Sequence, residues 1–322
     1  MTTFSDTVYS NGGLPVGGTG VPQTFGNYWF VDQDVASAGD GKSMKRAFKY
    51  LGQAQTAAST NNHDVICLGA NSAQKTTATT DTELAASKSR MHYVGLGGGS
   101  RYLGQRTRLT MGVTAASGGA IAVVKNTGVG NTFTNMKFDS SDTESTSLYA
   151  FADGGEYTQL TNCEIVKSTD LDQTTAAYLL CNGDSAYYKN CAIGSLVHII
   201  SAKRSCMLMN RVTITGKVAR DVVVEDCIFL IKTSSTDASC IHGSGATDIE
   251  RFMLLKNCQF INAVLGSADC DQAVEFDSAQ TEGYVLADNC SSVGFTAFST
   301  TTGVFSGTSL KHAQGPEALQ LS

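Results

Sequence analysis

The richest group of acidic residues in this sequence is SADCDQAVEFD, residues 267–277. Glycoside hydrolysis needs two carboxyl groups on either side of the scissile bond, roughly 5 to 9.5 Å apart. Asp269 and Asp271 on one face of a strand would lie about 7 Å apart, because a strand rises about 3.3 Å per residue. This pair is therefore the candidate catalytic acid pair.

The same stretch has a structural interpretation, which we favour. DCD can lead out of a solvated loop into a strand that VEF continues. A lyase would also need a base close to cationic or metal-bound groups that acidify a sugar proton. No Lys or Arg accompanies these acids, so the sequence offers no recognisable catalytic set.

Metal and phosphate sites are weakly indicated. The chain has ten Cys and five His but no CxxC, and Cys240 and His242 share a strand face without further ligands nearby in sequence. A structural zinc site needs four clustered ligands. GLGGGS, residues 95–100, lacks the GK[ST] ending of a phosphate loop, and no helix follows it. We therefore expect no metal and no cofactor.

A recurring Asn-Cys or Asp-Cys pair between apolar runs is the most regular feature of the chain. Aligned on the polar residue, the units lie 16 to 32 residues apart, mostly within the range of stacked repeats. Asn tolerates the left-handed backbone of a bend and can hydrogen-bond to copies of itself in neighbouring coils. Cys is small and packs well in an interior. The predicted column comprises Asn162, Cys163, Asn190, Cys191, Asp226, Cys227, Asn257, Cys258, Asn289 and Cys290, with Asn135 and Asn210 as further bend residues; Arg211 after Asn210 breaks the Cys series.

Four segments follow from composition and periodicity. Residues 1–26 have scattered Gly and no period, which indicates an extended arm rather than a folded element. Residues 27–63 contain a strand, NYWFVD, and one amphipathic helix from Met44 to Ala54 with Ser43 as N-cap. Residues 64–305 carry the repeats, and residues 306–322 form a short tail. Only 16% of the 322 residues are charged, which is typical of a protein with many strands.

YWFVD, AGDGKSMKRAF, the helix, DVICLG and the train of Asn-Cys units together resemble the right-handed parallel β-helices of bacteriophage virions and polysaccharide lyases. The resemblance covers residues 27 to about 305. It implies an all-β, right-handed parallel β-helix whose one helix plugs the N-terminal end of the stack.

From this resemblance we expect a structural virion protein of a tailed phage, a capsid decoration or cement protein. We expect the chain to associate with itself as a homotrimer and to bind the major capsid protein. Two alternatives stay open: a tailspike that depolymerises polysaccharide with Asp269 and Asp271, and a receptor fibre that binds host-surface polysaccharide without cutting it.

Composition adds further expectations about location. The net charge of −6 argues against nucleic acid as a partner. No apolar run reaches the roughly 20 residues of a membrane helix. The start, MTTFSDTVYSNGG, does not look like a signal peptide, which favours synthesis in the host cytoplasm with free thiols before assembly into the virion.

Charge is unevenly distributed along the chain. Residues 40–110 carry a net charge of +6, so the remainder carries −12. Since a solenoid keeps sequence order along its axis, we expect a basic N-terminal end and an acidic body. Basic residues at that end would favour an acidic capsid surface. The arm would add apolar anchors to the capsid contact: Phe4, Tyr9, Leu14 and Phe25.

Overall fold

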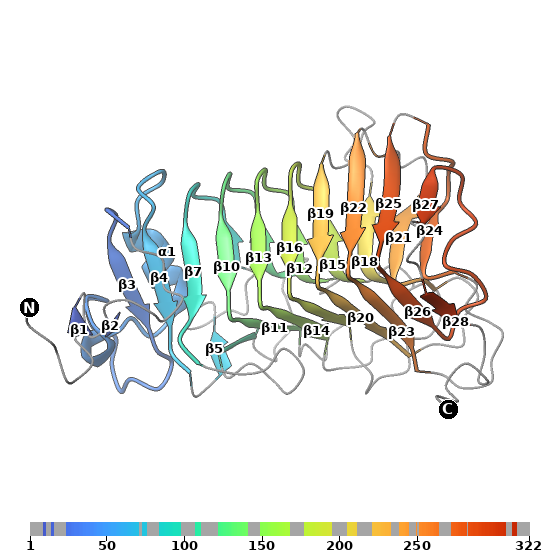
Figure 1. The fold of residues 1–322 in the computed structure, drawn as a ribbon. Helices are drawn as coiled ribbons and strands as arrows, with labels where there is room; N and C mark the ends of the chain where they lie inside the picture. Colours follow the sequence, from blue (N-terminus) through green and yellow to red (C-terminus); the bar gives the residue numbers. More distant parts are fainter. Residues whose placement is uncertain are drawn as a thin grey trace, which may run out of the picture.

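The chain winds into a parallel β-helix of three long sheets, as the sequence predicts (Figure 1). The computed structural model describes residues 9–10, 14–15, 24–70, 73–75, 84–97, 107–110, 122–140, 149–167, 177–194, 205–210, 221–232, 238–244, 249, 251–263, 272–281, 283–306 and 311–313. Within these ranges, every strand of the three sheets pairs in parallel with strands one coil away.

The first sheet has ten strands in sequence order along the axis. They are β3 (Tyr28–Val31), β4 (Val65–Leu68), β7 (His92–Gly95), β10 (Thr132–Thr134), β13 (Gln159–Thr161), β16 (Tyr187–Lys189), β19 (Val222–Glu225), β22 (Phe252–Lys256), β25 (Tyr284–Asp288) and β27 (Val304–Ser306).

The second sheet has nine strands: β5 (Ala73–Lys75), β8 (Arg108–Thr110), β11 (Lys137–Ser140), β14 (Glu164–Lys167), β17 (Ala192–Gly194), β20 (Ile228–Ile231), β23 (Gln259–Asn262), β26 (Ser291–Val293) and β28 (Lys311–Ala313). The third sheet has seven: β6 (Leu84–Ala86), β9 (Ala122–Asn126), β12 (Tyr149–Asp153), β15 (Ala177–Cys181), β18 (Ser205–Asn210), β21 (Ile241–Ser244) and β24 (Val274–Phe276). The pairing therefore continues past residues 64 and 305, which the sequence analysis takes as the limits of the repeats.

The interior between the three sheets is one continuous hydrophobic core. From β10 to β25 the strands of the first sheet alternate between buried and outward-facing side chains; in β22, Met253 and Leu255 are buried while Phe252, Leu254 and Lys256 face outward. Phe229 and Phe260 stack one coil apart inside, with ring centroids 4.9 Å apart. That distance matches the spacing of paired strands, so like side chains pile up along the axis.

The bend between the first and second sheets repeats at six predicted positions. Asn135, Asn162, Asn190, Asp226, Asn257 and Asn289 all adopt a left-handed backbone, with φ between 49° and 56°. Their side chains form a ladder in which an amide Nδ2 donates to the Oδ1 one coil earlier. Asn162 donates to Asn135 at 2.6 Å, and Asn190 donates to Asn162 at 3.3 Å. Asn257 donates to Asp226 at 3.1 Å, and Asn289 donates to Asn257 at 2.7 Å. The predicted column is confirmed at these positions.

The five cysteines of the column are buried and unbridged, as predicted. Each thiol lies 3.3 to 3.4 Å from the carbonyl oxygen two residues earlier, and a second carbonyl one coil away lies 3.4 to 3.6 Å from it. Burial raises the pKa of Cys163 and Cys227 well above the usual value for a thiol. The thiols of Cys163 and Cys227 are therefore packing groups held in the neutral form.

Asn210 is a correction to the predicted column. Its backbone continues β18 of the third sheet, where it pairs with Ser244, and it has no left-handed conformation. The break of the Cys series at Arg211 was the sequence signal that this residue does not belong to the bend.

The predicted helix from Met44 to Ala54 is also wrong in extent. A single 3-10 turn, η1 (Met44–Arg46), is followed by extended backbone at Phe48, which exchanges hydrogen bonds of 2.8 and 2.9 Å with Phe30 and Asp32. The α-helix α1 (Leu51–Ala57) begins only after this bridge, where the Gln53 side chain accepts from the N–H of Tyr50 at 3.0 Å. Pairing with β3 outcompetes helix propensity over residues 47–50.

The helix nevertheless lies where the resemblance implies. α1 packs at the N-terminal end of the stack, against β3, β4 and β6 (Figure 1). Leu51 and Ala54 enter the core, and the Gln55 side chain accepts a short hydrogen bond from the buried Tyr93 hydroxyl. Beneath the helix, the buried Asp64 carboxylate accepts from the Asn27 and Ser59 N–H groups and the Trp29 indole.

The predicted arm contains a folded element. β1 (Tyr9–Ser10) and β2 (Leu14–Pro15) form a two-stranded antiparallel ribbon, which corrects the expectation of a wholly extended segment. Gly12 and Gly13 separate the two strands in the sequence, and glycine favours the tight turn of a hairpin.

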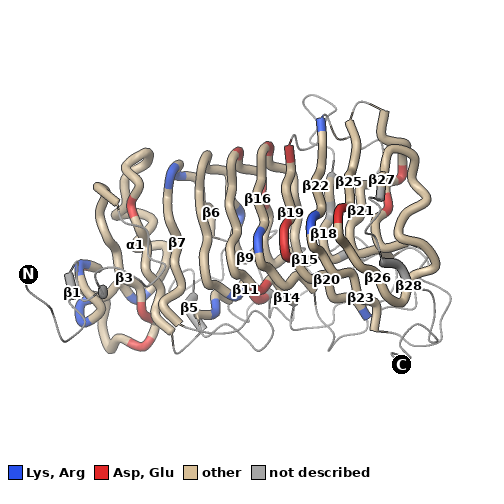
Figure 2. Tube along the Cα trace, viewed as in Figure 1, with Lys and Arg blue, Asp and Glu red and all other residues tan. Residues whose placement is uncertain are grey.

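The structure separates positive and negative charge along the axis less clearly than the expected basic end and acidic body (Figure 2). Because strand order equals sequence order, the described residues within 40–110 do lie at one end of the solenoid. Figure 2 shows both signs of charge at that end and along the body. Arg46 and Asp40, for example, form an ion pair at 2.8 Å.

A buried polar network supports the return from the third sheet to the first. The Asp153 Oδ1 accepts from Asn126 Nδ2 at 3.1 Å, Thr158 Oγ1 at 2.9 Å and the Gly155 N–H at 3.2 Å. Its Oδ2 accepts from the Tyr188 hydroxyl at 2.7 Å. Burial raises the pKa of Asp153, and these hydrogen bonds only partly offset the rise.

The ladder predicts the stability of variants at Asn257, which has one ladder bond on each side. Asn257→Gly should lower the free energy of unfolding by about 1–3 kcal/mol, because two side-chain hydrogen bonds are lost while glycine accepts the left-handed backbone. Asn257→Ala should cost about 1 kcal/mol more, because its Cβ disfavours that backbone. Urea unfolding measures both. Equal losses of unfolding free energy in the two variants would show that the left-handed backbone does not disfavour alanine. An unchanged free energy of unfolding would show that the ladder does not stabilise the fold.

The Asp153 network predicts a pH-dependent effect of Asp153→Asn. A raised folded-state pKa gives a contribution to stability that is complete below the unfolded pKa, about 3.9, and is lost as pH rises through the folded value. The neutral amide keeps its oxygen as acceptor and can donate to the Tyr188 oxygen, whose proton can turn to Cys181 Sγ, 3.3 Å away.

Asp153→Asn should therefore melt higher than the unmodified protein at pH 8, with the gain shrinking toward pH 4, in thermal unfolding followed by circular dichroism. Asp153→Ala is the matched control and should melt lower at every pH, because the buried donors of Asn126 and Thr158 lose their acceptor. A lower melting temperature for Asp153→Asn at pH 8 would refute the assignment.

Candidate functional site

The acid pair proposed from the sequence, Asp269 and Asp271, lies outside the described residues, so its role stays a prediction. The VEF strand that follows it is present as β24. Phe4 of the arm also lies outside the described residues. Tyr9 and Leu14 lie in the β1–β2 ribbon, and Phe25 is fully exposed, so the role of the arm in binding a partner also stays a prediction.

The outer face of the first sheet carries the most organised polar group. The residue just before each bend points outward from this sheet and is in register with its equivalent one coil away. In the C-terminal half these residues alternate in sign, and we call them the charged row: Lys189, Glu225, Lys256 and Asp288. Thr134 and Thr161 extend the same row toward the N-terminal end.

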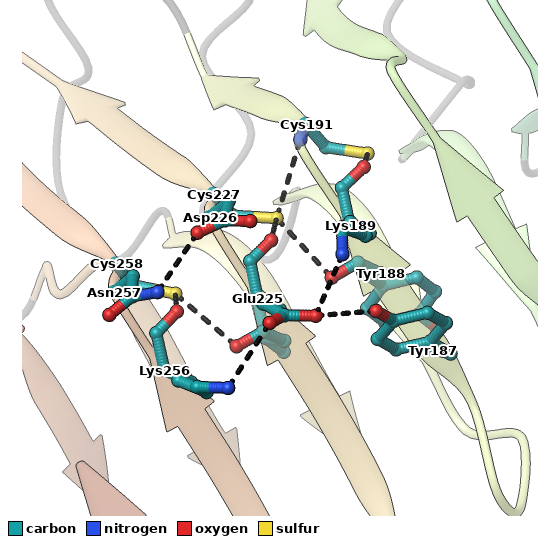
Figure 3. Close-up of polar contacts among 11 residues, drawn as sticks. Tyr187, Tyr188, Lys189, Cys191, Glu225, Asp226, Cys227, Lys256, Asn257 and Cys258 are labelled. Atoms are coloured by element: carbon teal, nitrogen blue, oxygen red, sulfur yellow. Dashed lines mark hydrogen bonds and ion pairs between the residues drawn. The ribbon is translucent and has the colours of Figure 1, made fainter. Parts of the chain in front are cut away.

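Glu225 is the centre of this row (Figure 3). Its Oε2 accepts from the Tyr187 hydroxyl at 2.5 Å and lies 3.2 Å from Lys189 Nζ, while its Oε1 lies 3.3 Å from Lys256 Nζ. The Tyr187 hydrogen bond first, and Lys189 next, hold the pKa of Glu225 at about 2. Glu225 therefore stays ionised and cannot serve as a general acid at neutral pH.

The two lysines keep part of their surface free for a ligand. The Lys189 and Lys256 side chains are 41% and 45% exposed, whereas Glu225 is 18% exposed. The hydrogen bond to Glu225 raises the pKa of Lys189, so its positive charge persists. One carboxylate thus fixes two cations at an outward face without covering them.

A second row runs parallel to the charged row, two residues earlier in each strand. We call it the apolar row: Tyr187, Val223, Leu254, Leu286 and Phe305. Phe305 is 57% exposed, and Tyr284, which pairs with Phe252 beside the row, is 46% exposed. Large apolar side chains in register on an outer face indicate a binding surface.

Sequence reasoning missed both rows, although a signal for them existed. Lys189 and Lys256 precede a predicted bend residue by one position, and Tyr187 and Leu254 precede it by three. In a strand, positions one and three before the bend share a face. Aligning the repeats on their bend residues would have placed both rows.

The sequence-level pairing of Cys240 with His242 is not realised. Cys240 is fully buried in the core, whereas the His242 side chain is partly exposed on the third sheet. Described side chains with the spacing of metal ligands do occur there: His242, Glu275 and Asp277. Among the described helices, none is long and apolar enough to span a membrane.

Comparison with known proteins identifies the fold. No protein-family model matches the sequence, and no curated protein matches it. Solved structures do match. The pectate lyase Pel9A aligns with a TM-score of 0.59 at 11% identity, over 92% of this chain and 76% of that one.

Two pectin methylesterases align over similar lengths. The enzyme from Aspergillus niger aligns with a TM-score of 0.54 at 11% identity, over 98% of this chain and 90% of that one. PemA from Erwinia chrysanthemi aligns with a TM-score of 0.50 at 13% identity, over 90% and 93%. At these identities the likeness establishes a shared architecture, the parallel β-helix.

Proposed function

We propose that this chain is a polysaccharide-binding β-helix and that an acidic polysaccharide lies along the outer face of its first sheet. The observation that carries the proposal is the apolar row beside the charged row, in register over successive coils. Sugar rings present apolar faces and polar edges, so they suit a surface where apolar and charged side chains run side by side.

The dimensions of the face suit an extended chain. The apolar row crosses five strands, from β16 to β27, which spans about 19 Å at the spacing of paired strands. A polymer lying along the axis can contact one coil after another through one outward side chain of the apolar row and one of the charged row. Such repetition gives many weak contacts whose free energies accumulate.

Two exposed lysines favour an acidic ligand between β16 and β22, whereas the exposed Asp288 at the end of the row on β25 does not. Lys189 and Lys256 are exposed cations, and Glu225 is already engaged by both of them and by Tyr187. A ligand carboxylate can accept charge-assisted hydrogen bonds from the remaining N–H groups of the two lysines. The solved neighbours named above include pectate and pectin enzymes, and their names agree with an acidic sugar polymer as the ligand class.

Binding is the part of this function that the described residues explain. The lowered pKa of Glu225 keeps it ionised, so it cannot donate a proton to a leaving sugar. Depolymerisation by Asp269 and Asp271 is a separate proposal, which fits a polysaccharide as ligand but needs its own test. Capsid decoration, a homotrimer and contact with a major capsid protein stay predictions from the sequence resemblance.

Variants of the two rows test the proposal. Lys256→Gln should weaken binding of acidic polysaccharides such as polygalacturonate or alginate by about ten- to a hundredfold, because a charge-assisted hydrogen bond contributes about 1.5–3 kcal/mol. Phe305→Ala should weaken it severalfold and leave the salt dependence unchanged. Isothermal titration calorimetry at two salt concentrations measures both effects, with a neutral glucan as the comparison ligand.

Two control variants make the same chemical changes elsewhere. Lys137→Gln removes a lysine on the second sheet, where it pairs with Glu164, and Phe25→Ala removes an exposed aromatic of the arm. Neither should alter binding. Failure of every acidic polysaccharide to bind, equal binding of the neutral glucan, or equal losses in the controls would each contradict the proposal.

A further inference from the structure

We propose that His242, Glu275 and Asp277 form a binding site for a divalent transition-metal ion on the third sheet. This site is independent of the polysaccharide face, which belongs to the first sheet. It arises from two neighbouring strands, β21 and β24, whose register places His242 directly beside Glu275.

Strand geometry brings the three side chains to one face. Glu275 and Asp277 are two residues apart, so they point the same way, and His242 on the adjacent strand points with them. The Asp277 N–H donates to the Gly243 carbonyl at 3.0 Å, which extends the pairing by one residue past β24. The position of Asp277 relative to His242 is therefore set by the backbone.

Gly243 contributes to the same geometry. A Cβ on Gly243 would lie 2.1 Å from Cδ1 of the Phe276 ring, so only glycine lets Phe276 pack inward at this point. Because Phe276 turns inward, its neighbours Glu275 and Asp277 both turn outward. The contact between Gly243 and the Phe276 ring thus fixes the backbone that carries the three side chains.

The separations between the donor atoms match those of ligands around one ion. His242 Nδ1 lies 3.7 Å from Glu275 Oε2, and Nε2 lies 3.5 Å from Asp277 Oδ1. One donor atom from each residue can be chosen so that all three lie within 4.8 Å of one another. Ligands bound at about 2.1 Å to a tetrahedral ion are about 3.4 Å apart, so modest side-chain rotation suffices.

His242 supplies a second indication. Its Nδ1 is buried and has no hydrogen-bond partner among the residues that the structure describes. A buried ring nitrogen without a partner is costly unless another group binds it. A metal ion bound to Nδ1, the ring nitrogen beside Glu275, would satisfy it.

The ligand types select the class of ion. Imidazole with carboxylates suits Zn²⁺, Co²⁺ or Mn²⁺, whereas Ca²⁺ prefers six to eight oxygen ligands. Three protein ligands leave at least one coordination position open. The Asp277 side chain is 45% exposed, so that position can be reached from solvent.

Titration of the chelator-treated full-length protein with Zn²⁺ and with Co²⁺ tests the site. Calorimetry should show one equivalent of metal ion bound per chain. Co²⁺ should give the visible absorption of a low-symmetry site, which ion pairs between His242 and the two acids would not produce. His242→Ala, Glu275→Gln and Asp277→Asn should each weaken binding by at least about tenfold, since even outer-shell changes cost 10- to 100-fold.

Two variants serve as controls. Glu156→Gln removes an exposed carboxylate away from the cluster and should not change binding. His92→Ala removes one of two stacked imidazoles whose nitrogens lie 3.2 Å apart, another place where an ion could bind, and it too should leave binding unchanged.

The alternative is that a protonated His242 merely forms ion pairs with the two acids. In that case neither ion binds at millimolar concentration, and this result would overturn the proposal. Binding that survives His242→Ala, or that His92→Ala abolishes, would overturn it as well. Circular dichroism of each variant shows whether the fold is kept, and the Co²⁺ spectrum of the unmodified protein reports the ligands independently of any variant.

Discussion

The rest of the structure depends on the left-handed bend between the first and second sheets. Six residues adopt this conformation at equivalent places, and their side chains hydrogen-bond along the axis. A shift of one residue in any coil would turn its side chains to the opposite face. By fixing where each coil turns, the bend places cysteine in the core just after it and the charged row on the surface just before it.

Because of this constraint, part of the molecule could be read from the sequence. Asn and Asp tolerate a left-handed backbone, and Cys after them is buried, so the pairs at 162, 190, 226, 257 and 289 reveal both the bend and the interior. The return from the third sheet to the first bends in the same way at Arg90, Tyr157, Ser185 and Asp221. These residues share no chemistry: Arg90 and Tyr157 are exposed and Ser185 and Asp221 are partly buried, so no residue type marks this bend in the sequence.

Tertiary pairing explains why the predicted helix begins late. Residues 47–50 have a helical apolar pattern, yet the Phe48 backbone bonds to β3 and delays α1. The candidate site was hidden for a similar reason. Lys189, Glu225 and Lys256 are more than 30 residues apart and become neighbours only through coil register. His242 and Glu275 meet in the same way on the third sheet.

On the first sheet, Glu225 is held as a carboxylate between two exposed lysines, which suits binding more than proton transfer. We propose that an acidic polysaccharide lies along this face, and a crystal structure with a bound uronate oligosaccharide is the decisive measurement. We expect electron density along the axis, with carboxylates at Lys189 and Lys256 and rings against Leu254 and Leu286. Density on the second or third sheet instead, or none at saturating ligand, would refute the proposal.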